Sequence, residues 1–387
     1  MFYNFDHLIE REGTSCIKYD LNETIFGKKD IIPMWVADMD FETPTFVRNA
    51  VIERANHPIY GYTFRNEAYY ESIINWFRNQ HRWEIKKDWI IYAPGVVPAL
   101  NLAVQSYTKP GDAIIVQPPV YFPFFTAVKD HERQLVNNTL IKGKEHYEID
   151  FDLLEKQASQ SRMLILCNPH NPVGRAWKKE ELEKVADICL RHNILVVSDE
   201  IHNDLVLPGF KHQVFADLSP DVAAITITAH AASKTFNLAG LATSSIIISN
   251  PDLRKRFNDT LQHLHLNMGN LFGFVASQTA FNEGKEWLIQ LLKYINHNVD
   301  FTVSFMEEKL PKIRVFRPEA TYMIWLDFGA YGFSDKELKN KMIQEAGLGL
   351  NSGIDFGSGG EGCMRLNVAC PRSILIDALE QMRIAFE

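Results

Sequence analysis

Lys234 is the residue of this sequence whose surroundings point most clearly to chemistry. It lies in the segment 223–241, AAITITAHAASKTFNLAGL, which opens with an alternating β-branched run and then passes through small residues. Such a run predicts a strand buried in a sheet. No other Lys, Arg, Asp or Glu occurs between residue 223 and Asp252. A lysine at the end of a buried strand loses its proton readily and can form a Schiff base, so Lys234 is a candidate carbonyl-reactive residue.

Polar residues also stand at the ends of two other predicted strands. Asp199 follows the apolar run 194–198, and a carboxylate buried there needs a cationic partner. Asn171 lies in the segment 168–174, NPHNPVG, where each Pro biases the preceding Asn away from the helical region. This segment is either a plain turn or a loop that presents the Asn side chains.

Three further positions offer an aromatic ring, a phosphate site and a cation. Tyr121 lies among prolines in PPVYFPF (118–124), where it either stacks on a flat ring or belongs to the core. The glycine turn PGVVP (94–98) leads into a helical pattern, and the free N–H groups of a helix N-terminus suit a phosphate. Arg365 lies in a strand pattern, and a half-buried Arg usually pairs with a carboxylate of the protein or of a ligand.

The elements that must position these residues alternate between strands and helices. Strands are predicted at 89–93, 113–117, 133–139, 163–167, 194–198, 223–228 and 244–248. Helical spacing of apolar residues occurs between some of them, at 100–107 and 182–189. This alternation predicts an α/β fold with a doubly wound, mostly parallel sheet, whose ligands bind at the carboxyl ends of the strands.

The sequence divides into three predicted parts. Residues 1–45 are irregular and place Trp35 beside two acids in MWVADMDF (34–41), which either line a pocket or form an arm against a neighbouring domain. We assign this arm to a small domain, residues 46–285 to a large cofactor-binding domain, and 286–387 to a small C-terminal domain. In the last part, a long helix is predicted at 286–309, strands at 321–328 and 364–368, and a helix at 334–345.

Several function classes are not expected. The net charge of −8 argues against nucleic acid as a partner. No signal peptide and no run of about 18 apolar residues is present, so we expect a cytoplasmic protein without a membrane segment. Five cysteines without CxxC spacing argue against disulfides and against a thiolate zinc site, and no metal is expected. The GxGxxG match at 357–362 precedes a strand pattern, whereas a dinucleotide site needs a helix there.

The strand-end residues together match one cofactor, pyridoxal phosphate. Its aldehyde, ring nitrogen, flat ring and phosphate call for a lysine, an acid, an aromatic residue and a helix N-terminus respectively. The acid keeps the ring nitrogen protonated, the lysine binds the aldehyde and moves a proton at Cα, and an arginine clamps an amino-acid carboxylate.

The chain resembles the fold-type I pyridoxal-phosphate enzymes of the aminotransferase class I/II superfamily. It is most similar to their cystathionine β-lyase branch of the PatB/MalY type. The matching motifs, which cover nearly the whole chain, are PMWVADMDF (33–41), YGYT (60–63), APGVV (93–97), QPPVYFPF (117–124), CNPHNPVGR (167–175), SDEIHNDL (198–205), SKTFNLAGL (233–241) and GGEGCMRLN (359–367). The resemblance implies a large domain with a seven-stranded, mostly parallel sheet and a smaller α+β domain.

The resemblance also implies a role for each matching residue. The residues that would contact the cofactor are Lys234 (aldehyde), Asp199 (ring nitrogen), Asn171 and His202 (phenolic oxygen), Tyr121 (ring face), and Gly95, Val96, Val97, Ser233 and Tyr62 (phosphate). Tyr62 would reach the phosphate of the other subunit, which implies a homodimer with shared active sites. The residues that would contact the substrate are Arg365, Trp35, Tyr121 and Asn171.

Two positions depart from typical aminotransferases of the superfamily. Ala242 stands where they carry an Arg eight residues beyond the lysine, and Ala231 stands where Ser is common. These departures favour the lyase branch, so we expect a cysteine-S-conjugate β-lyase, with cystathionine as one candidate substrate. An aminotransferase remains an alternative, because it uses the same cofactor and the same proton abstraction. A regulatory protein that binds a partner and retains the site is a third interpretation.

Overall fold

The structure is a computed structural model that describes residues 2–387. Its larger sheet has seven strands in the order β2-β10-β9-β8-β7-β3-β4. These strands are β2 (Ile90–Ala93), β3 (Ala113–Val116), β4 (Gln134–Asn137), β7 (Met163–Cys167), β8 (Leu195–Asp199), β9 (Thr226–His230) and β10 (Ser244–Ile247). All neighbouring pairs are parallel except the two that β10 makes. The expected mostly parallel, seven-stranded sheet is confirmed.

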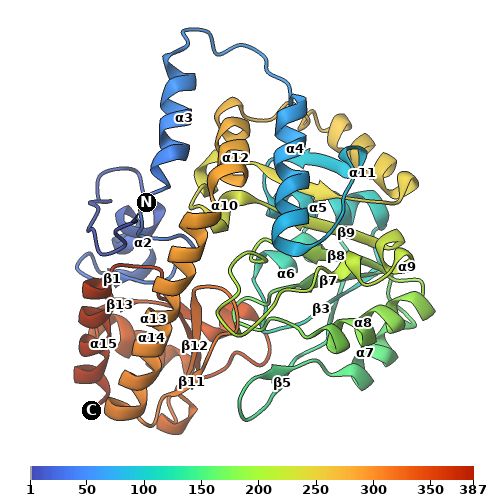
Figure 1. The fold of residues 1–387 in the computed structure, drawn as a ribbon. Coiled ribbons are helices and arrows are strands. Elements are labelled where there is room, and N and C mark those ends of the chain that lie inside the picture. Colours follow the sequence, from blue (N-terminus) through green and yellow to red (C-terminus); the bar gives the residue numbers. More distant parts are fainter. Residues whose placement is uncertain (1) are drawn as a thin grey trace.

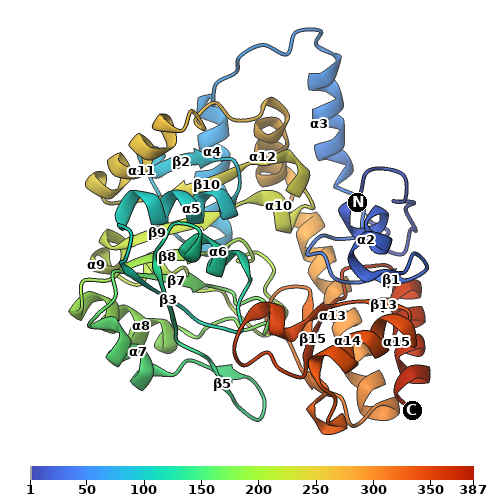
Figure 2. The ribbon, with the colours of Figure 1, turned by 180° about the vertical axis from the view of Figure 1, so that it is seen from behind.

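Helices cover both faces of this sheet, as the alternation of strands and helices predicted. One face carries α5 (Val96–Tyr107), α6 (Pro123–Lys129) and α11 (Pro251–His263), which lie in front of the strands in Figure 2. The helices that pack on the other face are α4 (Glu67–Trp76), α7 (Phe151–Ala158), α8 (Lys179–Arg191), α9 (Pro220–Ala224) and α12 (Leu271–Glu283). Because both faces are covered, the central strands β7 and β9 are buried along their whole length, and β7 consists of apolar residues alone.

One strand boundary was predicted wrongly. Residues 223 and 224 were assigned to a strand, but they end α9, and β9 begins at Thr226 and continues to His230. The helix begins because Ser219 caps it by accepting a hydrogen bond from the Val222 N–H, and Pro220 occupies its first position. The alternating run therefore forms only the first half of the strand.

The C-terminal part contains a second, antiparallel sheet in the order β11-β12-β15-β14. Its strands are β11 (Arg314–Phe316), β12 (Met323–Asp327), β15 (Cys363–Asn367) and β14 (Asn351–Ser352), and its helices are α13 (Lys285–Lys309), α14 (Asp335–Gln344) and α15 (Arg372–Phe386). The glycine loop 357–362 leads into the strand β15, as expected. Near the N-terminus, β1 (Ile32–Pro33) pairs in parallel with β13 (Leu348–Gly349), so the first and last segments of the chain lie side by side (Figure 1).

The remaining elements are short or peripheral. They are α1 (Ile17–Asp20), α2 (Asn22–Phe26), α3 (Thr45–Asn56), α10 (Ala232–Thr235), the hairpin of β5 (Ile141–Lys142) and β6 (Tyr147–Glu148), a π-helical turn at Phe77–His81, and 3₁₀ turns at Lys87–Trp89, Phe215–Asp217, Ala239–Leu241, Gly329–Tyr331 and Gly353–Phe356. Among residues 2–387, no helix combines the length and the apolar character that crossing a membrane requires.

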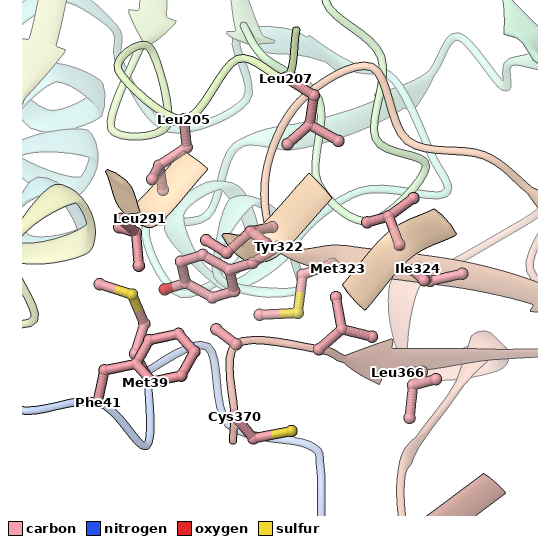
Figure 3. Close-up of a cluster of buried hydrophobic side chains, with 14 of the residues drawn as sticks. Met39, Phe41, Leu205, Leu207, Leu291, Tyr322, Met323, Ile324, Leu366 and Cys370 are labelled. Carbon is pink, nitrogen blue, oxygen red and sulfur yellow. The ribbon is translucent and has the colours of Figure 1, made fainter. Parts of the chain in front are cut away.

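A buried apolar cluster joins the N-terminal arm to both sheets. Figure 3 shows Met39 and Phe41 of the arm near Leu291 of α13, and the same cluster includes Leu205 and Leu207, which follow β8. Tyr322, Met323 and Ile324 of the smaller sheet belong to the same cluster (Figure 3). This packing holds the arm across the junction where the site described next is found.

Candidate active site

Two adjoining cavities lie at the carboxyl ends of the large sheet's strands. The inner cavity has a volume of about 230 Å³, and the predicted residues that line it are Gly95, Val96, Val97, Tyr121, Asn171, Asp199, His202, Ser233 and Lys234. The outer cavity, of about 650 Å³, is lined by Trp35 and Arg365 and shares Tyr121 and Lys234 with the inner one. The strand-end rule thus accounts for nine of the twelve predicted site residues, and the arm and the smaller sheet add Trp35 and Arg365.

Tyr62 is the predicted residue that this chain does not bring to its own cavities. It lies in the connection between α3 and α4, and 97% of it is exposed. Figure 1 shows this connection reaching away from the sheets. Its proposed role on another subunit is therefore compatible with its place in the fold, and stays a prediction.

Lys234 lies in α10, one short turn after β9, and is half-buried. The amine Nζ donates a hydrogen bond of 2.6 Å to the carbonyl oxygen of Ala37 in the N-terminal arm. Burial, followed by repulsion from Arg365, lowers the pKa of Lys234 to about 8. A sizeable fraction of this amine is therefore neutral near neutral pH, as a nucleophile or base requires.

The arm segment that accepts the Lys234 hydrogen bond is itself held by further hydrogen bonds. The carbonyl oxygen of Ala37 also accepts a hydrogen bond of 3.0 Å from the Tyr322 hydroxyl. On either side, the amide of Asn367 donates to the carbonyl oxygens of Val36 and Asp38, at 2.7 Å each. The smaller sheet thereby fixes the arm segment that meets the lysine.

Asp199 ends β8 and is buried without a cation bonded to it. Within residues 2–387, the one hydrogen bond that its carboxylate accepts comes from the Ile201 N–H, at 3.1 Å. Burial raises the pKa of Asp199 to about 7. The sequence predicted a cationic partner for this acid, and the protein itself supplies only the more distant charge of Lys234. The acid is therefore ready for a cationic group of a ligand in the cavity.

His202 follows Asp199 by three residues and lines the same cavity. Burial, together with the positive charges of Lys234 and Arg365, lowers the pKa of His202 to about 3. Its Nδ1 atom is buried and has no hydrogen-bond partner among the residues described. The ring is therefore neutral and has an unused polar atom at the cavity.

Arg365 is buried on β15 and is held by neutral oxygens. Its Nη1 donates to Asn171 Oδ1 at 2.9 Å, and its Nη2 donates to the Trp35 carbonyl and to Asn351 Oδ1, both at 2.7 Å. Burial lowers the pKa of Arg365 to about 10, and its Nε lacks a partner within residues 2–387. None of the ion pairs in that range includes Arg365, so its charge is left for a ligand carboxylate.

The N-terminus of α5 forms the opposite wall of the inner cavity. Gly95 caps it with a φ of +134°, and a Cβ there would lie 3.3 Å from Pro98 Cδ. Glycine is therefore needed for the turn that exposes the first N–H groups, those of Val96 and Val97. Ser233 adds a hydroxyl to the same cavity.

Ala242 and Thr243 also line the inner cavity. The wall is thus uncharged at the position where typical aminotransferases are expected to carry an Arg. Thr243 was missed by the sequence analysis, although its hydroxyl beside the noted departure was an available signal. A phosphate here would rely on backbone N–H groups and hydroxyls.

These observations fit pyridoxal phosphate. The cavity offers a lysine of lowered pKa, an acid without a bonded cation, an unpartnered histidine nitrogen and an exposed helix N-terminus. These groups correspond to the aldehyde, ring nitrogen, phenolic oxygen and phosphate of the cofactor.

A second polar cluster, which the sequence analysis missed, lies behind Lys234. The buried carboxylate of Asp204 accepts hydrogen bonds from Trp76 Nε1 (3.0 Å), His81 Nε2 (2.8 Å) and Thr235 Oγ1 (2.8 Å). Burial alone would raise the pKa of Asp204, but the hydrogen bond and charge of His81 lower it to about 2. Because Thr235 follows the lysine, this carboxylate anchors the turn that carries Lys234.

Comparison with known proteins identifies the family. Residues 29–380 match the aminotransferase class I and II family, and the chain belongs to that family. It is 44% identical to cystathionine β-lyase PatB of Bacillus subtilis over 384 residues, which cover 99% of each chain. The resemblance to the PatB/MalY-type cystathionine β-lyases is therefore confirmed.

Solved structures agree with this placement. Cystalysin from Treponema denticola, in a crystal structure that contains pyridoxal 5′-phosphate, is 38% identical, with a TM-score of 0.96 over 100% of this chain and 99% of that one. The pyridoxal-phosphate-bound C–S lyase of Staphylococcus hominis is 33% identical, with a TM-score of 0.93 over 100% and 98% of the two chains. The fold-type I architecture expected from the sequence is confirmed.

Proposed function

We propose that the chain is a pyridoxal-phosphate-dependent carbon–sulfur lyase. It would convert S-substituted L-cysteines, cystathionine among them, to a thiol, pyruvate and ammonia by β-elimination. The observation that carries this proposal is the inner cavity, where a half-buried lysine of lowered pKa and a buried acid of raised pKa lie together. The names of its relatives, cystathionine β-lyase and C–S lyase, support the same reaction.

The inner-cavity residues would hold the cofactor. Lys234 would bind its aldehyde, and Asp199 would pair with the protonated ring nitrogen, which is the cation that this acid lacks. Asn171 and His202 would contact the phenolic oxygen, and Tyr121 would stack on the ring face. The phosphate would be bound by Ser233 and by the N–H groups of Gly95, Val96 and Val97. When bound, pyridoxal phosphate supplies a carbonyl for the substrate amine and a ring that stabilises negative charge at Cα.

The chain's own groups would bind the substrate and move its proton. Arg365 would hold the α-carboxylate, since its charge has no carboxylate partner among residues 2–387. Lys234, partly neutral at a pKa of about 8, would take the Cα proton. The electron pair left at Cα then expels the sulfur from Cβ as a thiolate, and water completes the conversion to pyruvate and ammonia.

An assay without any keto acid tests this proposal. Purified holoenzyme is mixed with cystathionine and a series of S-alkyl cysteines under anaerobic conditions, and pyruvate and free thiol are measured. We expect both products in equal amounts. Lys234→Ala is expected to abolish turnover, because it removes the base and the aldehyde-binding amine. Full activity of this variant would refute the mechanism.

Two other functions are less favoured by the names of the relatives. An aminotransferase would form a keto acid from the substrate only when a keto-acid acceptor is added, so the same assay separates it from a lyase. A regulatory protein with a retained site would bind a partner. A pull-down without a specific partner would weaken that alternative.

We also propose a homodimer with shared active sites. The connection between α3 and α4 exposes four large side chains, with exposed fractions of 66% for Ile59, 61% for Tyr60, 97% for Tyr62 and 80% for Phe64. Apolar side chains in this number on one loop are typical of a protein interface. Tyr62 would then reach the phosphate of the other subunit. Light scattering should give twice the chain mass of 44.4 kDa.

We also propose two domains and a cytoplasmic location for this chain. Residues 1–45, an arm of the small domain, pair with the C-terminal part through β1 and β13. Residues 46–285 would form the large cofactor-binding domain, and 286–387 the small domain. All five cysteines are free thiols, which fits the reducing conditions of the cytoplasm.

A further inference from the structure

The outer cavity is where the S-substituent of a substrate would lie. With the α-carboxylate on Arg365 and Cα at Lys234, the remaining space of this cavity is bounded by Ile17, Trp35 and Phe122. These side chains suit an alkyl or thioether chain. One further side chain of the wall, Asp355, is charged, and it has no place in the mechanism above.

Asp355 is the one acid among the residues that line the outer cavity. The two cations of that wall are the half-buried Lys234 and the buried Arg365. In the proposed function they are used by the cofactor and the α-carboxylate. Asp355 is exposed, and within residues 2–387 no hydrogen bond or ion pair engages its carboxylate. Its charge acts on Arg365 at longer range, where it opposes the lowering of the Arg365 pKa. When Arg365 binds the α-carboxylate, the Asp355 charge is left for the other end of the substrate.

The charges behind Trp35 do not compensate Asp355. Arg11 contacts both Asp38 and Asp40 at 2.6 Å, and the buried Lys18 contacts Asp40 at 2.6 Å. These two cations and two anions neutralise one another. The net charge that the S-substituent meets is thus set by Asp355.

The position of Asp355 is fixed by its neighbours. It belongs to the 3₁₀ turn Gly353–Phe356, and the Phe356 carbonyl accepts a hydrogen bond of 2.8 Å from the Val120 N–H. The Phe356 ring lies 4.9 Å from the Arg365 guanidinium and packs edge-on against Trp325 at 5.5 Å. The turn therefore holds this carboxylate at the mouth of the cavity, in a constant relation to the residue that binds the α-carboxylate.

We propose that Asp355 selects S-substituents that end in a cationic amine. This inference rests on the proposed lyase function and names the substrate class within it. A primary ammonium at the end of a short chain would meet an opposite charge at the mouth while its methylenes contact the apolar wall. A neutral substituent of equal length would gain only the apolar contacts, and an anionic one would be repelled.

Two isosteric substrates test this selection on the holoenzyme. S-(2-aminoethyl)-L-cysteine and S-propyl-L-cysteine have the same chain length and differ in charge. We expect the native enzyme to show a kcat/KM about fivefold higher for the aminoethyl compound, the size expected for a partly exposed charge pair. Asp355→Asn should remove this preference and leave kcat/KM for the propyl compound within about twofold. Asp355→Lys should reverse the preference.

Asp152→Asn provides the matched control, because Asp152 is an exposed acid on α7 that lines neither cavity. It should keep the native ratio. An unchanged ratio in Asp355→Asn, or no preference in the native enzyme, would overturn the proposal. If neither compound yields pyruvate, the lyase function fails instead. The ratio of their dissociation constants, read from the absorbance of bound pyridoxal phosphate, then decides the role of Asp355 separately.

Discussion

Two buried acids, Asp199 at the end of β8 and Asp204 in the loop that follows it, have very different surroundings. Asp199 faces the inner cavity and accepts one hydrogen bond, from a backbone N–H, and burial raises its pKa to about 7. Asp204 lies five residues later and accepts three hydrogen bonds from side chains. The hydrogen bonds from His81 and Thr235, with the charges of His81 and His230, outweigh its burial and lower its pKa to about 2.

The difference separates an acid used for structure from an acid kept for a ligand. A buried carboxylate that the protein satisfies by itself stabilises the fold. One that the protein leaves unsatisfied costs stability until a cation arrives, and such perturbed groups mark functional sites. Both acids are buried, so it is their partners in the protein, and not their burial, that give them opposite pKa shifts.

The largest expected effect is the loss of catalysis when Asp199 is replaced. Asp199→Asn keeps the shape but removes the charge that would hold the ring nitrogen protonated. We expect kcat to fall by roughly 10³-fold, the loss typical of removing a group that stabilises developing charge. Initial rates of pyruvate release from a saturated holoenzyme measure this. A fall of less than about tenfold would mean that Asp199 does not tune the cofactor.

The pH dependence of stability should also differ between the two acids in cofactor-free protein. Because the folded-state pKa of Asp199 is raised above its unfolded value of 3.8, the native state binds the extra proton, and the stability that Asp199 contributes falls as the pH rises from about 4 to 7. A shift of about three pKa units corresponds to a loss of up to about 4 kcal/mol. Asp204, with a lowered pKa, should contribute stability above about pH 4 and lose it below, towards pH 2.

Urea unfolding of the cofactor-free protein between pH 5 and 8 measures this contrast. The buried histidines His170, His202 and His230 also titrate near this range, but they contribute equally to both proteins. The free energy of unfolding of the native protein, relative to that of Asp199→Asn, should therefore fall from pH 5 to about pH 7. Parallel profiles for the two proteins would contradict the raised pKa of Asp199. Addition of pyridoxal phosphate should also remove most of the loss, because the cofactor supplies the missing cation.

The smallest expected effect concerns the hydrogen bond between Thr235 and Asp204. Thr235→Val keeps the shape of the side chain but removes one of the three hydrogen bonds to Asp204. We expect a loss of about 1–2 kcal/mol in the free energy of unfolding, since a buried hydrogen bond to a charged group is lost. Thermal unfolding of the holoenzyme measures it. Thr235→Ser, which retains the hydroxyl, should recover much of the loss, and equal loss in both variants would mean that the bond to Asp204 is unimportant.

The sequence predicted the large sheet and most of the inner cavity. Buried strands are apolar throughout, and their carboxyl ends converge, so Asp199, Asn171 and Lys234 could be brought together from local patterns alone. The start of β9 was missed because Ser219 and Pro220 begin a helix within the same apolar segment. Patterns along a chain therefore show where a strand lies more reliably than they show at which residue it begins.

The cluster around Asp204 could not be predicted in the same way. Trp76 and His81 precede Asp204 by 128 and 123 residues, and both belong to a helical region without a distinctive motif. The contact between Arg365 and the Trp35 carbonyl spans 330 residues. Such partners become visible only when the packing of the two sheets and the arm is known.

The hydrogen bond between Lys234 and the carbonyl oxygen of Ala37 limits which mutations the arm can accept. A carbonyl oxygen belongs to every amino acid, so substitutions at position 37 can keep the bond, provided that the new side chain fits. Insertion or deletion of one residue between β1 and Phe41 would instead place another carbonyl before the lysine and disrupt the bonds to Asn367. The arm should therefore tolerate changes of residue type far better than changes of length.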